Sequence, residues 1–198
     1  MAEAALHPAG HQAPAAFTRA QLDWLPWLEP LGPEDLTPRH MQALVDAARA
    51  KSAYFRLLAR DPAILEARTK TDKDIFYNPQ GGLPRAEREL AAAAASRFNG
   101  CIYCASVHAR FAATYSKREA DVQRFLDEGV GAKLDERWQA IVAAAVALSA
   151  TPPEFGPEHL TRLRAAGLDD AAILDVIYAA SFFNWANRLM LSLGEPAS

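Results

Sequence analysis

Hydrophobic side chains recur along most of this chain at three- and four-residue intervals, which is the spacing of an amphipathic helix. Residues 135–150 illustrate it, because Trp138, Ile141 and Val142 fall on one face. Runs of β-branched residues, which favour strands, are missing. The pattern predicts an all-α fold of about seven to nine helices, some of them short. The expected helices cover residues 38–51, 62–76, 84–98, 101–116, 118–128, 135–150, 157–166 and 169–193.

Caps and breakers set the expected helix ends. Thr37 followed by Pro38 is an N-cap with proline at the first helical position. Residues 78–82 read Asn-Pro-Gln-Gly-Gly and form a loop, whereas Thr151 with two prolines ends the helix before it. Gly167 is the expected C-cap of the helix over residues 157–166.

The first 36 residues have a different composition and are expected to form an N-terminal arm, followed by one domain over residues 37–198. Residues 1–16 are rich in Ala, Pro, Gly and His, and we expect an arm or disorder there. Trp24 and Trp27 follow, and aromatic side chains are unfavourable in solvent. We therefore expect this stretch to wrap the domain or a neighbouring subunit, and exchange between subunits is a hypothesis.

A short internal echo suggests two related helical units. Residues 94–99 read Ala-Ala-Ser-Arg-Phe-Asn, and residues 179–184 read Ala-Ala-Ser-Phe-Phe-Asn. Chance is the alternative, because the chain is rich in alanine. If the echo is real, one unit carries chemistry and the other serves packing.

Composition and charge exclude several functional classes. The 198 residues are enough for one domain with a substantial core. A net charge of −3 and the absence of a Lys/Arg stripe argue against nucleic-acid binding. No signal peptide and no membrane span are expected, and two cysteines are too few for a secreted disulfide scaffold. We expect a cytoplasmic protein.

Candidate chemistry lies in the only two cysteines, Cys101 and Cys104, and in His108. Spacings of three and seven residues point these side chains to one face of a helix. Asn99-Gly100 is a break, so Cys101 is expected at a helix start. Unpaired N–H groups there favour the reactive thiolate, and a histidine can exchange its proton. The pattern predicts a redox site.

Two other interpretations fit the same cysteines. They could be half of a zinc site, but closed zinc sites take four ligands, and His7, His11, His40 and His159 are scattered. They could also be inert small core residues. Attachment of haem would need a histidine directly after the second cysteine, where the chain has Ala105.

Glu89, twelve residues before Cys101, completes the pattern E-x11-C-x2-C-x3-H. This pattern resembles the alkylhydroperoxidase AhpD-like branch of the carboxymuconolactone decarboxylase family. Gly167-Leu168-x-Asp170, Phe182-Phe183-Asn184 and Asn187-Arg188 resemble its peroxidase-related members, and the likeness covers residues 38–194. The resemblance implies an all-α fold, a trimer or hexamer, and chemistry without a metal or haem cofactor.

The resemblance also implies roles for four residues. Cys104 corresponds to the peroxidatic cysteine, Cys101 to the resolving cysteine, and Glu89 with His108 to a proton relay. Cys104 would become a sulfenic acid and then a disulfide that an external dithiol reduces. The helix-start argument alone would instead choose Cys101 as the nucleophile.

Two features leave parts of this scheme open. Tyr103 stands where the best-described members have a histidine, and a tyrosine with a pKa near 10 is a poorer relay at neutral pH. Tyr103 could equally be a packing residue. Glu89 could belong, with Arg85, Glu87 and Arg88, to a solvated first helical turn.

The function predicted from these residues is a thiol-dependent peroxidase that reduces hydrogen peroxide or an organic hydroperoxide. A dihydrolipoyl or thioredoxin-like protein is the expected reductant. One alternative is a protein disulfide reductase or adaptor that uses the same dithiol. Another is a non-catalytic helical oligomer that senses oxidation or binds metal. Carboxymuconolactone decarboxylation is not expected, because lactone chemistry does not require a CxxC pair.

Overall fold

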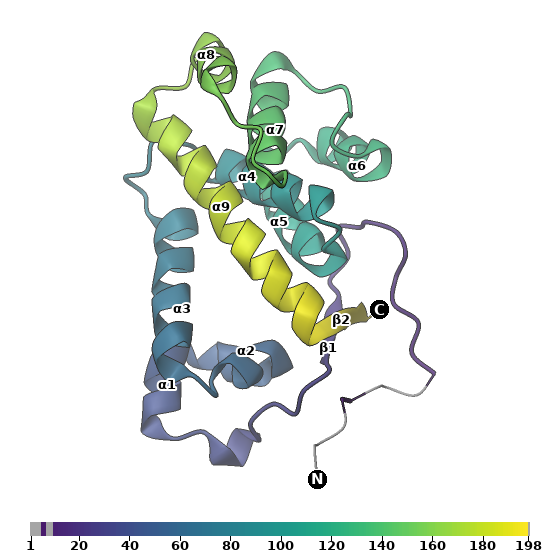
Figure 1. The fold of residues 1–198 in the computed structure, drawn as a ribbon, viewed down its shortest axis with the longest axis vertical. Helices are drawn as coiled ribbons and strands as arrows, with labels where there is room; N and C mark the ends of the chain where they lie inside the picture. The colour runs from purple at the N-terminus through teal and green to yellow at the C-terminus, as the bar shows by residue number, and fades with distance from the viewer. Residues whose placement is uncertain (1–4, 7–9, 198) are drawn as a thin grey trace.

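The computed structural model describes residues 5–6 and 10–197, and these are mostly helical (Figure 1). The nine α-helices found there are α1 (Pro38–Leu44), α2 (Ala53–Leu58), α3 (Pro62–Tyr77), α4 (Arg85–Phe98), α5 (Ile102–Ser116), α6 (Glu119–Glu128), α7 (Glu136–Ser149), α8 (Pro157–Ala165) and α9 (Asp170–Leu193). The remaining elements are two 3-10 helices, η1 (Pro33–Asp35) and η2 (Ala47–Lys51), and two strands, β1 (Asp23–Pro26) and β2 (Gly194–Ala197). The predominantly helical fold is confirmed.

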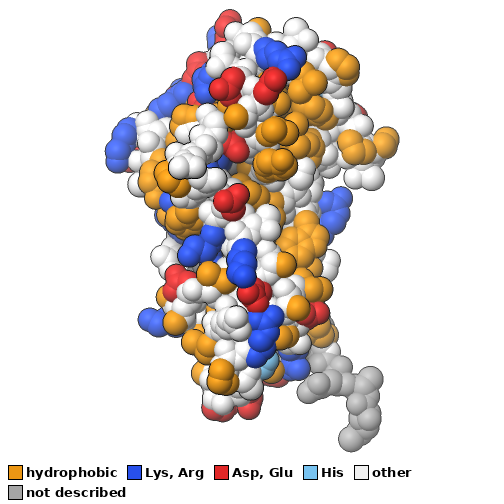
Figure 2. All heavy atoms as spheres, turned by 90° about the vertical axis from the view of Figure 1, so that its left-hand side faces the viewer, with side chains coloured by type: hydrophobic (Ala, Val, Ile, Leu, Met, Phe, Trp, Pro, Cys, Tyr) orange, Lys and Arg blue, Asp and Glu red, His pale blue; other side chains and the backbone are white. Residues whose placement is uncertain are grey.

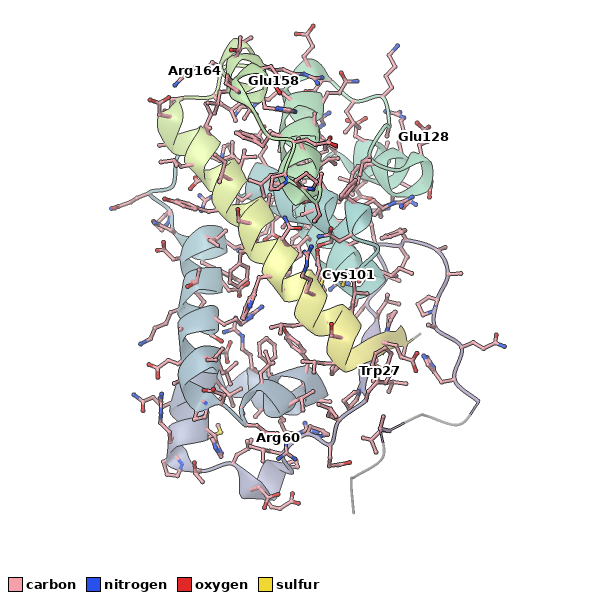
Figure 3. All side chains as sticks on the ribbon, in the orientation of Figure 1. Trp27, Arg60, Cys101, Glu128, Glu158 and Arg164 are labelled. Carbon is pink, nitrogen blue, oxygen red and sulfur yellow. The ribbon has the colours of Figure 1, made fainter. Side chains whose placement is uncertain are left out.

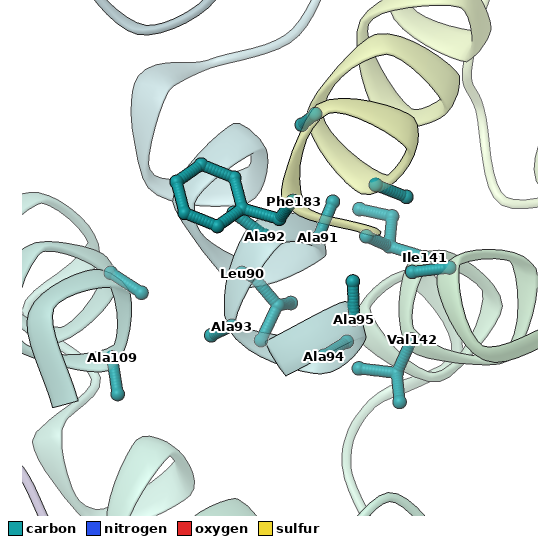
Figure 4. Close-up of a cluster of buried hydrophobic side chains, with 14 of the residues drawn as sticks. Leu90, Ala91, Ala92, Ala93, Ala94, Ala95, Ala109, Ile141, Val142 and Phe183 are labelled. Carbon is teal, nitrogen blue, oxygen red and sulfur yellow. The ribbon is translucent and has the colours of Figure 1, made fainter. Parts of the chain in front are cut away.

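Helix α4 lies at the centre of the core and packs against α5, α7 and α9. Its residues 90–95 are one leucine and five alanines, all fully buried. Figure 4 shows them between Ala109 of α5, Ile141 and Val142 of α7, and Phe183 of α9. Because alanine has no side chain beyond Cβ, the neighbouring helices can approach the α4 backbone closely.

The two echoed segments lie against each other. The Nδ2 of Asn99, which follows α4, donates to the Oδ1 of Asn184 in α9 at 2.9 Å. The alanines of both segments are fully buried, which fits the extensive packing of α4 against α9. Descent of the two units from one ancestral unit stays a prediction.

Side-chain caps begin four of the nine described helices near the expected residues. Thr37, Asp61, Asp135 and Asp169 each accept a hydrogen bond from a backbone N–H in the first turn of α1, α3, α7 and α9, respectively. The expected helix over residues 38–51 is wrong in its second half. Helix α1 ends at Leu44, because Val45 adopts a left-handed φ of 63°, and η2 follows it.

The expected absence of strands is also wrong, because β1 pairs antiparallel with β2 and joins the two ends of the chain. Trp24 is buried, and its Nε1 donates to the Met190 carbonyl at 3.3 Å. The N-terminal segment therefore wraps its own domain, which is one of the two arrangements expected from the sequence. Gly194 permits the close approach, since a Cβ there would lie 2.2 Å from the Leu25 oxygen.

The face in Figure 2 shows basic and acidic side chains interspersed with apolar ones. Among the described helices, none combines the length and the apolar character needed to cross a membrane.

Candidate active site

The two cysteines lie at the start of α5. Helix α4 ends at Asn99, Gly100 turns the chain with φ of 79°, and Cys101 is the N-cap residue of α5. Figure 3 shows Cys101 near the middle of the molecule. Cys101 and Cys104 are both free and buried, and they lie 3.0 Å apart. The expected position of Cys101 at a helix start is confirmed.

The surroundings of the two thiols push their acidities apart. The side-chain hydrogen bond from Cys104 lowers the pKa of Cys101, and the Cys104 backbone N–H and the Asn187 side chain lower it further, against the effect of burial. Burial raises the pKa of Cys104 well above its usual value, and its hydrogen bond to Cys101 adds to this. Cys101 is thus the more acidic thiol, in the direction that the helix-start argument predicts.

Glu89 and His108 form a buried pair beside these thiols. Glu89 lies in α4 with 1% of its surface exposed, and its Oε2 is 2.6 Å from the Nδ1 of His108 in α5. The His108 ring packs against Phe76 and Phe183, with centroid distances of 5.1 and 3.9 Å. Since Nδ1 faces the carboxylate, Nε2 is the ring atom left to exchange a proton.

The alternative interpretation of a solvated first turn in α4 is wrong. Glu87, Arg88 and Glu89 are each less than 9% exposed. The charges are compensated inside the protein: Arg137 Nε binds Glu87 at 2.7 Å, and Arg85 Nε binds Glu89 at 3.1 Å. Burial with such partners explains why three charged residues fit into a buried turn.

A cavity of about 210 Å³ brings Cys104, Glu89 and His108 together. Aromatic and basic side chains complete much of its wall: Arg49, Tyr54, Phe55, Arg68, Phe76, Tyr77, Arg85, Tyr103, Phe111 and Phe183. Cys101 instead lines a separate cavity of about 130 Å³, next to Ala13, Pro14 and Trp24 of the N-terminal segment.

The spacing brings Cys101 and Cys104 together, as predicted, but Cys101 lines a different cavity from Cys104 and His108. As the N-cap it has a non-helical backbone with ψ of 90°, which turns its side chain out of the phase of Cys104 and His108. Tyr103 lines both cavities, and burial raises its pKa, so the phenol stays protonated near neutral pH.

Asn187 belongs to the site, although sequence reasoning assigned it no role. It is fully buried in α9, its Nδ2 donates to Ser96 Oγ at 3.0 Å, and its Oδ1 accepts from Asn99 at 3.0 Å. Its side chain also reaches both thiols. The Asn187-Arg188 pair in the family resemblance was the available signal. Within the described ranges, no three His, Cys, Asp or Glu side chains gather closely enough to hold a metal ion.

Comparison with known proteins gives a family match over part of the chain and a shared fold. The family model of the carboxymuconolactone decarboxylase family matches residues 62–147. A peroxidase-related protein from Ralstonia eutropha JMP134, described as an alkylhydroperoxidase AhpD core, has a TM-score of 0.73 at 22% identity and covers 86% of this chain and 91% of its own. A peroxidase-related protein from Silicibacter sp. TM1040 has a TM-score of 0.70 at 22% identity, covering 86% and 92%.

A third similar structure has a different activity. A cysteine-to-alanine variant of the debrominase Bmp8, in complex with 2,3,4-tribromopyrrole, has a TM-score of 0.65 at 20% identity and covers 83% of this chain and 87% of its own. At these identities, the three structures establish the shared fold alone. No curated protein matches the chain significantly.

Proposed function

We propose that this chain, whose residues 62–147 match the model of the carboxymuconolactone decarboxylase family, is a thiol-dependent peroxidase. Hydrogen peroxide or an organic hydroperoxide would be the oxidant, and Cys104 the attacking residue. The observation that carries the proposal is the arrangement of the cavity of about 210 Å³ that Cys104 lines. Cys104 faces the same cavity as the Glu89–His108 pair and lies 3.0 Å from Cys101.

The chemistry proceeds in two steps. His108 takes the proton of Cys104 at Nε2, and the thiolate attacks the terminal peroxide oxygen. The O–O bond breaks, Cys104 becomes a sulfenic acid, and the alkoxide takes the proton from His108 to leave as an alcohol. Cys101 then attacks the Cys104 sulfur as a thiolate and releases hydroxide, which takes a proton and leaves as water. A disulfide remains, and an external dithiol reduces it.

The acidities of the thiols suit these roles. A high pKa keeps Cys104 protonated at rest, so its activation requires a base, and the Glu89–His108 pair lines its cavity. A low pKa keeps Cys101 ready as the attacking thiolate of the second step. This division supports Cys104 as the peroxidatic and Cys101 as the resolving cysteine.

The test follows consumption of one equivalent of cumene hydroperoxide by the reduced protein. His108→Asn and Glu89→Gln should slow the reaction by about 100-fold or more, because general acid–base catalysis contributes that much. Glu128→Gln, at the end of α6, removes a carboxylate away from the cysteines and should react like wild type (Figure 3). Wild-type protein that consumes no hydroperoxide would refute the proposal.

The reductant and the assembly are part of the same proposal. A dihydrolipoyl or thioredoxin-like protein would reduce the disulfide, and the chain would work as a trimer or hexamer. Helix α9 supports assembly, because it exposes Leu174, Tyr178 and Trp185 by 46%, 53% and 40%. Large apolar side chains grouped on one helix face are typical of an interface.

Reductive debromination is a second candidate. The Bmp8 structure with 2,3,4-tribromopyrrole shares the fold, and the aromatic wall of the cavity suits a flat halogenated ring. The dithiol would supply the two electrons and become a disulfide, while the bromine leaves as bromide. Bromide release from 2,3,4-tribromopyrrole by the reduced protein, without hydroperoxide consumption, would favour this candidate.

A further inference from the structure

The cavity that Cys104 faces contains buried polar atoms that have no partner. In the described part of the chain, the Tyr54 hydroxyl and the Nε and Nη1 of Arg68 are buried without a hydrogen bond. Both side chains line the cavity that Cys104 faces. A buried donor without an acceptor is unfavourable, so such groups are normally paired. These donors are therefore the part of the wall that a ligand would complete.

Arg68 is held in place by rings rather than by hydrogen bonds. Its guanidinium carbon lies 5.3 Å from the ring centroids of both Phe55 and Phe182. Asp72 Oδ2 is 3.5 Å from Arg68 Nη1, without the geometry of a hydrogen bond. Asp72 is also 3.3 Å from Arg49, with which it does form a hydrogen bond. The guanidinium is thus fixed in position with donors to spare.

The charges around the cavity are not balanced. Arg49 is paired with Asp72, and Arg85 is paired with Glu89. Arg68 is the third arginine of the wall, and no third carboxylate lines it. With His108 neutral, the wall carries one positive charge in excess. This excess suits a ligand with a single negative charge.

We propose that the oxidant is a small organic hydroperoxide with a carboxylate and an apolar or aromatic body. Arg68 and Tyr54 bind this carboxylate. The planar guanidinium matches a carboxylate, and the phenol donates a further hydrogen bond. Phe76, Phe111 and Phe183 contact the apolar body, and Cys104 receives the hydroperoxide group. The identity of the reacting group rests on the proposed function, whereas the carboxylate subsite rests on the unpaired donors.

Burial keeps the Tyr54 phenol in its donating form, because desolvation raises its pKa despite the nearby Arg68 charge. Arg68 is also close enough to Cys104 for its charge to act on the thiol. Tyr54, Arg68 and Cys104 therefore line the same cavity, of about 210 Å³.

The test compares two alkylating reagents on one thiol. In a Cys101→Ser background, Cys104 is alkylated with iodoacetate and with iodoacetamide. The quantity compared is the rate with iodoacetate divided by the rate with iodoacetamide. The ratio cancels the thiolate population, because the same thiolate reacts with both reagents. Arg68→Gln should lower the ratio about tenfold, and Tyr54→Phe about threefold, through loss of a hydrogen bond to the anion.

The control is Arg164→Gln, which removes an exposed arginine of α8 at the opposite end of the molecule (Figure 3). It should leave the ratio unchanged. Tyr54→Phe removes only a hydroxyl and keeps the ring that packs against Trp24, so it is expected to fold and keeps the test decisive if Arg68→Gln does not fold. A second measurement is calorimetry on the reduced wild-type protein, in which benzoate should bind and benzamide should not.

The outcomes separate this inference from the peroxidase proposal. A lowered ratio without hydroperoxide consumption supports the subsite and refutes the peroxidase. Hydroperoxide consumption with an unchanged ratio in Tyr54→Phe and Arg68→Gln overturns the subsite and leaves the peroxidase standing. Equal binding of benzoate and benzamide also overturns the subsite.

Discussion

At the scale of single residues, the site depends on unequal thiols. Hydrogen bonds from Cys104 and Asn187 lower the pKa of Cys101, whereas burial raises that of Cys104. The same residue type thus has a lowered pKa at one position and a raised pKa at the other. Only two residues of the chain separate the two cysteines, so their environments, rather than their identities, divide the chemistry.

This division predicts the pH dependence of alkylation. In Cys104→Ser, the serine hydroxyl can still donate to Cys101, so the rate of Cys101 alkylation should rise through a midpoint below pH ~8.5, the pKa of a free cysteine. In Cys104→Ala that donor is lost, the pKa of Cys101 rises, and the midpoint should move to higher pH. Rates with iodoacetamide measured across pH check both variants. Equal midpoints in the two variants would contradict the role of the Cys104 hydrogen bond.

The residues of the candidate site were only partly predictable from the sequence. Helical periodicity predicts which residues close in sequence lie near one another. It therefore indicated four site residues: Glu89, Cys101, Cys104 and His108. Arg68 did carry a signal: it follows Leu65 by three residues and lies on the buried side of α3 with Leu65 and Phe76, an unusual place for an arginine. Tyr54 carried none, since an apolar segment gives no sign of which hydroxyl lacks a partner.

At the scale of elements, the ribbon of β1 and β2 shows why some features escaped prediction. The strand β1 reads Asp-Trp-Leu-Pro, which has no alternation or β-branching, and its partner β2 lies at the other end of the chain. Pairing of this kind is set by tertiary contact. Helices α3 to α9, by contrast, begin and end within a few residues of the caps and breakers seen in the sequence.

The close approach of these strands predicts the effect of one methyl group. Gly194→Ala would place its Cβ 2.2 Å from the Leu25 oxygen and 2.3 Å from the Trp24 ring. The variant should lose about 1–3 kcal/mol of unfolding free energy through overpacking, or β1 and β2 should no longer pair. Denaturant unfolding measures it, with Gly131→Ala as the control, since a Cβ there meets no atom within 4 Å. Equal unfolding free energies of the two variants would contradict the close approach of β1 and β2 at Gly194.

At the scale of the whole molecule, the sequence predicted a mostly helical fold, which is confirmed, and a family whose model matches residues 62–147. Periodicity identifies helices, and the pattern of Glu89, Cys101, Cys104 and His108 identifies relatives. Neither reveals that the cysteines face different cavities, because this depends on how α3, α9 and the N-terminal segment enclose α5. Figure 1 shows α9 running across most of the molecule, and its residues Phe183, Ala186 and Met190 line the cavity that Cys104 faces.

The exposed side chains of α9 predict the effect of a charge on assembly. Trp185→Glu, on the face shared with Leu174 and Tyr178, should lower the mass in solution to that of a smaller species, because a charge is unfavourable in an apolar interface. Light scattering measures the mass. Leu28→Glu, at a 52% exposed position of the N-terminal segment, is the matched control. An unchanged mass for Trp185→Glu would contradict an interface on this face.

The central claim is that Cys104 attacks the peroxide and Cys101 resolves it, and mass spectrometry of the oxidised thiols tests this directly. Reduced wild-type protein treated with one equivalent of hydroperoxide should lose the mass of two hydrogen atoms and give a peptide with a Cys101–Cys104 disulfide. Cys101→Ser should instead keep a sulfenic acid on Cys104, which dimedone labels. A sulfenic acid on Cys101 in Cys104→Ser, with none on Cys104 in Cys101→Ser, would contradict the claim.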